Sequence, residues 1–388
     1  MSLNLDKSRW TRVKFGEVVF NVNSTVKDAE AAGLDRVIAM EHLDPGELRI
    51  QRWGNVEDGT TFTRRVKPGQ TLFGKRRAYQ SKVAYAEFDA ICSGDILTFQ
   101  ANETHLLPEF LPFLVQSDGF FAHALGTSAG SLSPRTNWTD LSDFEFELPP
   151  LDAQRRLAEL LWKFEDHLNT LRDAISAIHQ ATEEKFSAML NRYSHQGEIV
   201  SDLLDYMTVG VVVKPTQYYT EESTGVPALR GLNILRGSFD LRELVRFKVE
   251  SAAALTKSTL QAGDVVIVRT GRAGDAAVVT EEIAGFNCID LIITRPSNLI
   301  YPQFFARYLN SSYGRDQIAR LSAGTAQQHF NVGALKKLRF PDIGKADQIE
   351  IDAKLTEMDN AAHMIALEID HLNRLRANLL TDIFGGAQ

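Results

Sequence analysis

The sequence has few of the residues that support metal or redox chemistry. Only Cys92 and Cys288 are present among 388 residues, which is too few for a disulfide framework or a cysteine-based zinc site and is consistent with a reducing compartment. The nine histidines show no His-Glu-x-x-His spacing. We therefore expect a protein with no metal and no other cofactor.

Long hydrophobic runs and an excess of positive charge are also missing. The most apolar stretch, 106–115, contains Pro108, Glu109 and Pro112 and is too short to cross a bilayer. Residues 1–10 lack the apolar core of a signal peptide, so we expect a cytoplasmic protein. The 42 Lys and Arg against 50 Asp and Glu give a formal charge of −8, which argues against coating nucleic acid or membrane by net charge. Any contact with nucleic acid must therefore be a local patch.

The chain is a tandem duplication. Half of its 388 residues is 194, and shifting the sequence against itself by that length brings similar residues into register. The matched pairs are Pro108 with Pro302, Gly130 with Gly324, Asn137 with Asn331, Leu141 with Leu335, Gln154 with Gln348 and, after a slip of one or two residues, Cys92 with Cys288. Residues 11–59 have no convincing counterpart in 201–250, so the halves share a frame but differ in detail.

A long helical pattern closes each half. After Pro149 and Pro150, apolar residues recur in steps of three and four, which is a heptad seam. Its members are Leu157, Leu161, Phe164, Leu168, Leu171, Ile175, Ile178 and Thr182. Half a chain later stand Ile351, Leu355, Met358, Ala362, Ile365, Ile369, Leu372 and Arg376, so the seam recurs and fails only at its last member. Asp152 is the expected N-cap of the first helix, and Asp347 to Glu350 form a capping-box-like start for the second.

Each helix is expected to run about 40 residues, or roughly 60 Å. An isolated helix with one apolar stripe must bury it, and the two seams are most simply buried against each other in an antiparallel pair. The alternative is that each helix packs on its own globule or on another chain.

The remainder of each half predicts a globule. Short β-rich runs such as 82–85 and 96–99, with a helical pattern near 107–125, indicate a mixed α/β domain. The predicted fold is mixed α/β, with two α/β globules separated by a pair of long antiparallel coiled-coil helices. The expected boundaries are 1–148 for the first globule, 149–194 for the central helix, 195–343 for the second globule and 344–388 for the C-terminal helix.

Two short motifs resemble enzyme signatures but lack the context these need. Residues 69–76 have the spacing of a phosphate-binding loop through Lys75, but Arg76 stands where Ser or Thr must coordinate magnesium. Residues 126–130 match the Gly-x-Ser-x-Gly pattern, but a helical pattern precedes them where a nucleophile elbow needs a strand. We therefore expect no catalytic chemistry in this chain.

Basic residues concentrate in one run. Residues 64–82 contain seven Lys and Arg and no acid in 19 positions, with Tyr79 and Gln80 among them. Arginine can bind guanine and glutamine can bind adenine through paired hydrogen bonds, and both can contact phosphate. A solvated hairpin face is an equally good explanation of the charge alone.

The second half has a shorter counterpart. Residues 269–274 are again basic, with glycines that let the backbone approach a ligand. A polar cluster follows in each half, at 131–137 and 325–331, and its amides suit either adenine readout or loop capping. The candidate DNA-contacting residues are Lys75, Arg76, Arg77, Tyr79, Gln80, Lys82, Arg135, Asn137, Arg269, Thr270, Arg272, Gln327, Gln328 and His329.

In this order, the motifs resemble those of the specificity subunits of type I restriction-modification systems. The resemblance rests on Gly-x-x-Leu-Phe-x-Lys-x-Arg at 69–77, the segments 91–96 and 131–138, Leu-Pro-Pro-Leu-Asp-Ala-Gln at 148–154, and the related runs 263–269 and 324–328. The second junction lacks the double proline, and Ala153 and Asp347 replace a Glu that often precedes the junction Gln.

The resemblance implies a non-catalytic DNA reader with two target-recognition domains, each reading one part of a split, asymmetric site. It also implies that the paired helices act as a spacer and dock two copies of a DNA adenine methyltransferase subunit, which engage a restriction motor-nuclease subunit. Residues 347–384 carry eight acids and three bases, which suits a protein partner or solvent better than DNA. The alternative is a coiled-coil adaptor whose globules bind proteins and whose basic run is incidental.

Overall fold

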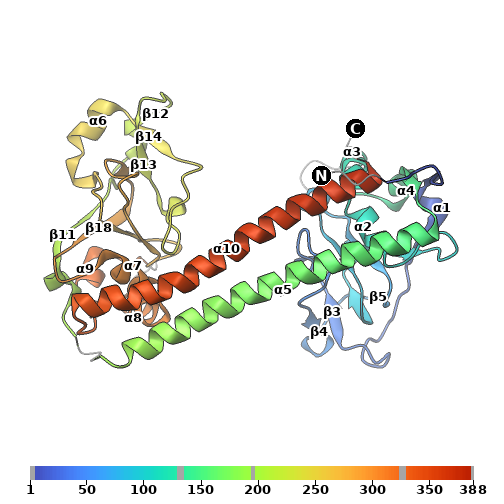
Figure 1. Cartoon of the computed structure of the whole chain (residues 1–388), viewed down its shortest axis with the longest axis horizontal. Helices are drawn as coiled ribbons and strands as arrows, with labels where there is room; N and C mark the ends of the chain where they lie inside the picture. Colours follow the sequence, from blue (N-terminus) through green and yellow to red (C-terminus); the bar gives the residue numbers. More distant parts are fainter. Residues whose placement is uncertain (1–4, 129–134, 194–196, 323–328, 386–388) are drawn as a thin grey trace. The chain divides into compact units, whose positions relative to one another are not determined.

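The computed structural model describes residues 5–128, 135–193, 197–322 and 329–385. The chain folds into two compact units, in which Met1–Asp173 and Ile365–Gln388 form unit 1 and Ala174–Met364 form unit 2. The boundaries fall inside two long helices, α5 (Leu151–Leu190) and α10 (Lys345–Phe384), so each unit holds one part of each helix (Figure 1).

Unit 1 is built on two four-stranded sheets and a two-stranded ribbon. One sheet has the order β2-β9-β6-β7 and is antiparallel throughout, whereas in the other, β4-β3-β8-β5, strands β3 and β8 are parallel. The strands are β1 (Thr11–Lys14), β2 (Val19–Asn21), β3 (Arg36–Ile38), β4 (Gly54–Asn55), β5 (Arg64–Val66), β6 (Thr71–Gly74), β7 (Val83–Tyr85), β8 (Ala90–Cys92), β9 (Ile96–Ala101) and β10 (Glu145–Leu148).

Short helices cover the sheets of unit 1. They are α1 (Phe15–Val18), α2 (Leu111–Val115), α3 (Asp118–Gly126) and α4 (Trp138–Ser142), with 3-10 turns η1 (Met40–His42), η2 (Val56–Asp58) and η3 (Ala78–Gln80). The helical pattern near 107–125 is thus broken into α2 and α3, because Ser117 caps α3 by accepting a hydrogen bond from the Phe120 amide.

Unit 2 also contains two four-stranded sheets, in the orders β11-β18-β15-β16 and β12-β14-β13-β17. Its strands are β11 (Leu204–Val209), β12 (Tyr219–Thr220), β13 (Val226–Leu229), β14 (Val245–Phe247), β15 (Val265–Val268), β16 (Ala276–Val278), β17 (Asn287–Cys288) and β18 (Leu291–Pro296). Its helices are α6 (Val249–Ala254), α7 (Pro302–Asn310), α8 (Ser312–Ser322) and α9 (Val332–Leu335), with η4 (Val200–Leu203), η5 (Pro215–Tyr218), η6 (Gly231–Asn233) and η7 (Thr256–Ser258).

The predicted duplication is confirmed by the sheet topology. The order β2-β9-β6-β7 recurs as β11-β18-β15-β16, and a parallel strand pair recurs with Ile38 opposite Cys92 in unit 1 and Leu229 opposite Cys288 in unit 2. The equivalent strands β2 and β11, and β3 and β13, lie in the stretches that show no convincing sequence match. The fold is therefore repeated even where the residues have diverged.

A buried glutamine ties the long helix to the globule in each unit. In unit 1, Gln154 Nε2 donates to the carbonyl oxygens of His105 and Pro149, both at 2.8 Å, and its Oε1 accepts from the Leu107 amide at 2.9 Å. In unit 2, Gln348 makes the same three bonds, with Leu299, Ile343 and Tyr301, which stand half a chain later. Both side chains are buried, at 0% and 1% exposure, so the two matched glutamines are equivalent parts of the structure.

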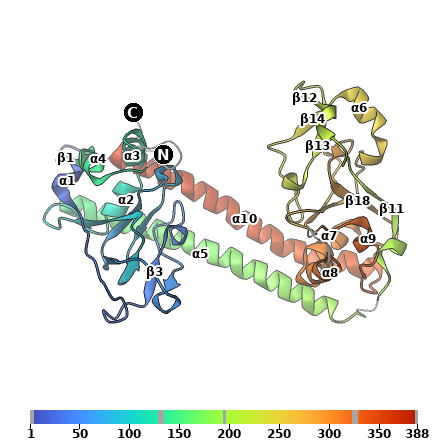
Figure 2. The same ribbon diagram turned by 180° about the vertical axis from the view of Figure 1, so that it is seen from behind.

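The two predicted long helices are confirmed, each with 40 residues. No residue of either seam is exposed, and in each unit α5 and α10 lie side by side (Figures 1 and 2). Asp152 and Asp347 were expected at or near the caps, but α5 begins at Leu151 and α10 at Lys345, so both carboxylates lie in the first turn, where the helix dipole favours negative charge.

The helix pairing is antiparallel within each unit. In unit 1, the core includes Leu161 from early in α5 and Ile383 from late in α10. In unit 2, it includes Phe186 from late in α5 and Leu355 from early in α10. The seams are thus buried against each other and against both cores, rather than each helix packing only on its own globule.

Arg376, where the seam pattern fails, is buried beside a carboxylate. Its Nη1 contacts Glu165 Oε1 and donates to the Gly46 carbonyl at 3.0 Å, and the two charged side chains are only 11% and 1% exposed. Burial raises the pKa of the Glu165 carboxyl, while the Arg376 charge acts to lower it. A polar pair therefore occupies this position of the seam in unit 1.

No helix in the described part of the chain is long and apolar enough to cross a bilayer.

We predict that Gln154→Ala and Gln348→Ala each lower the free energy of unfolding by about 1 to 3 kcal/mol, because each leaves buried backbone groups without a hydrogen-bond partner. Amide hydrogen exchange should localise the loss of protection to unit 1 for the first variant and to unit 2 for the second. Gln180→Ala is the control, since this exposed residue bonds to Glu184 one helical turn away. Equal exchange in all three variants would contradict the anchoring role.

Candidate nucleic-acid interface

Two segments predicted to contact DNA meet in unit 1. The β6–β7 loop (residues 75–82) begins with Lys75, whose carbonyl oxygen accepts from the Thr136 amide at 3.0 Å. The next residue, Arg76, forms an isolated antiparallel bridge with Arg135. Candidates that are about 60 positions apart in the sequence are thus joined by backbone pairing.

Asp95 orients the arginines at this junction. Its carboxylate lies 3.5 Å from Arg76 Nη1 and 3.3 Å from Arg135 Nη2, and the arginine side chains are 46% and 58% exposed. One carboxylate thus lies close to two arginines that are both exposed. Lys75 is half-buried beside them, and burial, with the charge of Arg64, lowers the pKa of its ammonium group.

The middle of the β6–β7 loop holds an aromatic side chain toward solvent. Tyr79 is 57% exposed, although its neighbour Ala78 is buried. The turn η3 is flanked by Arg77 at φ 56° and Ser81 at φ 50°, in the left-handed region that non-glycine residues rarely adopt. Such strained positions often mark binding or catalytic loops. Gln80 is half-buried in the same turn.

Several cations of the acid-free run have structural partners. Lys82 Nζ donates to the Met40 carbonyl at 2.6 Å, and Arg65 Nε lies 3.0 Å from the Asp89 carboxylate. Arg64 donates to a backbone carbonyl at the start of β9. The exposed cations of the run are therefore Lys67, Arg76 and Arg77, and the last two lie beside the exposed Tyr79.

Unit 2 repeats the junction with other side chains. The Arg269 carbonyl accepts from the Phe330 amide at 3.0 Å, which is the same bond half a chain later. Thr270 Oγ1 lies 2.7 Å from His329 Nδ1, so two more predicted residues come together. Arg269 itself pairs with Asp290 and is only 18% exposed, which makes it an internal support of the β15–β16 loop (residues 269–275). Gln327 and Gln328 lie outside the described residues.

The matched asparagines differ in their bonding. Asn331 Oδ1 accepts from the Ala334 amide at 2.9 Å and so caps α9. Asn137 is exposed and its side chain makes no capping bond to α4. Loop capping therefore explains Asn331, while the Asn137 amide is accessible to a ligand.

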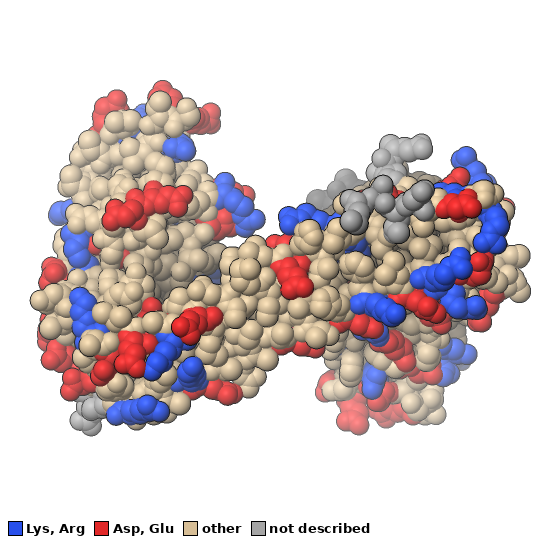
Figure 3. All heavy atoms as spheres, viewed as in Figure 1, with Lys and Arg blue, Asp and Glu red and all other residues tan. Residues whose placement is uncertain are grey.

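Sequence reasoning missed three residues that organise these loops. Asp95 lies between two predicted arginines, and in unit 2 the predicted Arg272 lies 3.7 Å from Asp275, which also binds Arg315. Charge counting could not find them, because Asp95 is distant in sequence from both of its arginines and Asp275 is distant from Arg315. On the face seen in Figure 3, basic and acidic side chains alternate over each unit, so the positive charge is arranged locally.

Neither cysteine is placed for chemistry. Both thiols are buried, and burial raises the pKa of Cys92 to about 12 and also raises that of Cys288. The segment that resembles a phosphate-binding loop forms the buried strand β6 in place of a loop before a helix. Within the described ranges, His, Cys, Asp and Glu nowhere form a group that could hold a metal ion.

Comparison with known proteins relates one segment of the chain to a family. Residues 54–179, which include the β6–β7 loop and its partner segment at 135–137, match the family model of the type I restriction modification DNA specificity domain. This segment of the chain is thus similar to the type I restriction-modification specificity family. The resemblance seen in the sequence is thus confirmed, and the family is one of DNA sequence recognition.

Individual members of the specificity family are distant in sequence. The type I restriction enzyme EcoDI specificity subunit of Escherichia coli is 24% identical over 183 residues, which cover 45% of this chain and 40% of that protein. The match thus spans less than half the length of this relative.

Two solved structures share the fold. One, from work on complex assembly and conformational transition of the type I R-M system, has a TM-score of 0.57 and 18% identity, covering 97% of this chain and 98% of that chain. The other, the type I restriction-modification S subunit of M. genitalium, has a TM-score of 0.54 and 15% identity, covering 100% and 99%.

We predict that Arg76→Ala and Arg77→Ala weaken DNA binding by the full chain. Loss of a phosphate contact should lower affinity for all sequences and reduce the salt slope by about 1, whereas loss of a base contact should cost about 1 to 3 kcal/mol at one position of the site. Arg12→Ala, at a residue 77% exposed and paired with Glu145, is the matched control. If both loop variants bind like the control at every salt concentration, the β6–β7 loop does not contact DNA.

Proposed function

We propose that this chain is a non-catalytic DNA-recognition subunit whose two units each read one part of a split, asymmetric site. The main support for this proposal is that both units join the same two loops through a matched backbone hydrogen bond. The bond runs from the Thr136 amide to the Lys75 carbonyl in unit 1 and from the Phe330 amide to the Arg269 carbonyl in unit 2. The side chains around that bond differ, with Arg76 and Arg135 in unit 1 and Thr270 and His329 in unit 2. A shared frame with different donors and acceptors suits two half-sites of different sequence.

We further propose that α5 and α10 set the distance between the half-sites and dock two copies of a DNA adenine methyltransferase subunit, which engage a restriction motor-nuclease subunit. The surface of α10 supports a protein partner. Met364 and Leu367 are 64% and 47% exposed and stand one helical turn apart, on a helix with an excess of acids. Exposed apolar side chains on an acidic helix suit a protein interface and disfavour DNA.

We predict that deleting the gene removes adenine methylation from one bipartite motif of the host genome, and that restoring it returns the same motif. Single-molecule sequencing with base-modification detection measures this. The Arg76→Ala, Arg77→Ala double variant should alter methylation at one half of the motif only. If the methylated motifs are the same with and without the gene, the protein does not direct methylation, and a coiled-coil adaptor becomes the better description.

The helix pair provides a second test. Inserting seven residues after Ile175 in α5 and after Ile365 in α10 preserves both heptad seams and lengthens each helix by roughly 10 Å, about three base pairs. The methylated half-sites should stay the same while the spacer between them grows. Inserting seven Gly and Ser residues at the same points is the control, since it interrupts the helices. Methylation only of the original spacing by the heptad variant would show that these helices do not set the distance.

A further inference from the structure

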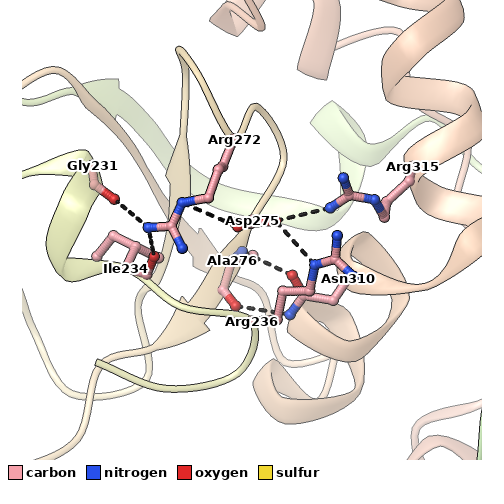
Figure 4. A network of polar contacts seen from close by, with 8 residues as sticks. All are labelled: Gly231, Ile234, Arg236, Arg272, Asp275, Ala276, Asn310 and Arg315. Carbon is pink, nitrogen blue, oxygen red and sulfur yellow. Dashed lines mark hydrogen bonds and ion pairs between the residues drawn. The ribbon is translucent and has the colours of Figure 1, made fainter. Parts of the chain in front are cut away.

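Three arginines of unit 2 converge on one buried carboxylate. The Asp275 side chain is 4% exposed and lies 2.8 Å from Arg315 Nη1, 3.3 Å from Arg236 Nε and 3.7 Å from Arg272 Nε (Figure 4). The arginines come from three separate segments, which are α8, the chain after η6 and the β15–β16 loop. We call these four residues the Asp275 cluster.

The backbone around Asp275 is held on both sides. The next residue, Ala276, donates from its amide to Asn310 Oδ1 at 3.0 Å and accepts from Asn310 Nδ2 at 2.8 Å (Figure 4). The preceding residue, Gly274, has φ 91°, and a Cβ there would lie 2.7 Å from the Ile318 side chain of α8. Only glycine suits this conformation and this contact, so the loop is fixed against α8.

Arg272 is also fixed. Its Nη2 donates to the carbonyl oxygens of Gly231 at 3.1 Å and Ile234 at 2.6 Å, while its Nε faces Asp275. Arg272 thus has three partners within unit 2, and its side chain is still 47% exposed. An arginine already ordered in this way loses little conformational entropy when it binds a ligand.

The cluster carries more positive charge than its internal carboxylate requires. One cation would neutralise Asp275, but three are present, and the side chains of Arg236 and Arg315 are 59% and 34% exposed. Two positive charges therefore remain at the surface. Ordered guanidinium groups with further N–H donors match the oxygens of a phosphate group in charge and shape.

We propose that Asp275 is a positioning residue that presents Arg236, Arg272 and Arg315 to the phosphodiester backbone of DNA. This inference rests on the proposed function, because Arg272 belongs to the β15–β16 loop that also carries Thr270 of the candidate interface. The phosphate contact fixes the position of unit 2 on the duplex, while the neighbouring Thr270 and His329 side chains face the bases.

Unit 1 has no equivalent among the described residues. The bond from the Val268 amide to the Asp275 carbonyl, at 2.9 Å, corresponds to that from Gly74 to Lys82 at 3.0 Å, so a lysine stands where unit 2 has the carboxylate. Half a chain before Arg315 is Phe121. The Asp275 cluster is therefore a property of unit 2, whereas unit 1 places Arg76 and Arg135 beside Asp95.

The test measures binding of the full chain, assembled with its methyltransferase subunits, to random-sequence duplex DNA over a series of NaCl concentrations. Arg236→Gln and Arg315→Gln should each reduce the slope of log affinity against log salt by about 0.9 and weaken binding roughly fivefold to tenfold near 0.1 M salt. Arg242→Gln is the matched control in unit 2, because this residue is 87% exposed and pairs with Asp240 two positions away. It should leave the slope nearly unchanged.

Asp275→Asn separates positioning from net charge. This variant loses one negative charge, so electrostatics alone would strengthen DNA binding, whereas loss of the anchor should weaken it severalfold. Thermal unfolding shows whether the variant is folded; if it is not, the two arginine variants decide.

The outcomes also separate this inference from the proposed function. Slopes like that of the control in both arginine variants would overturn the role of the Asp275 cluster and leave DNA recognition intact. Tighter binding by a folded Asp275→Asn protein would overturn positioning. Loss of methyltransferase assembly with unchanged DNA binding would assign the cluster to a protein interface. Absence of salt-dependent DNA binding by the unmodified complex would instead overturn the proposed function itself.

Discussion

The structure depends on the burial of two long apolar stripes. Most of the stability of a helix in a protein comes from packing its apolar face, and here each helix contributes side chains to both cores. Leu161 and Ile383 lie in the core of unit 1, and Phe186 and Leu355 in that of unit 2. Full burial of such side chains stabilises by about 1.5 to 3 kcal/mol each. Each helix is therefore part of both cores, so a change in helix packing alters the cores on which the loops rest.

Periodic and repeated signals made much of this fold predictable. The heptad spacing gave both long helices, and the interval between Gln154 and Gln348 marked two anchors that prove equivalent bond for bond. The equivalence of β2 and β11 was not predictable, because a strand of three to six residues can be built from many apolar sequences. Its backbone pairing is conserved between the units by the neighbouring strands β9 and β18.

The sequence marked a candidate interface but did not show which of its side chains are free to bind a ligand. Charge density located the β6–β7 loop, yet it could not show that Lys82 and Arg65 are bound within the fold while Arg76 and Arg135 share Asp95. Contacts between residues far apart in sequence leave no spacing pattern to read. For the same reason, Arg236 and Arg315 carried no signal in the sequence, since their common partner, Asp275, is about 40 residues from each.

The division of the long helices between the units has a consequence for biosynthesis. Unit 2 is one continuous stretch, Ala174–Met364, whereas unit 1 needs Ile365–Phe384 to complete a core that begins near the start of the chain. During synthesis on the ribosome, part of the apolar surface of the first globule therefore stays exposed until the whole of unit 2 has emerged. Unit 2, although it is synthesised later, can thus complete its core first. Until α10 has emerged, the surface beside Leu157 and Leu161 stays exposed, and chaperones that bind nascent chains can protect it.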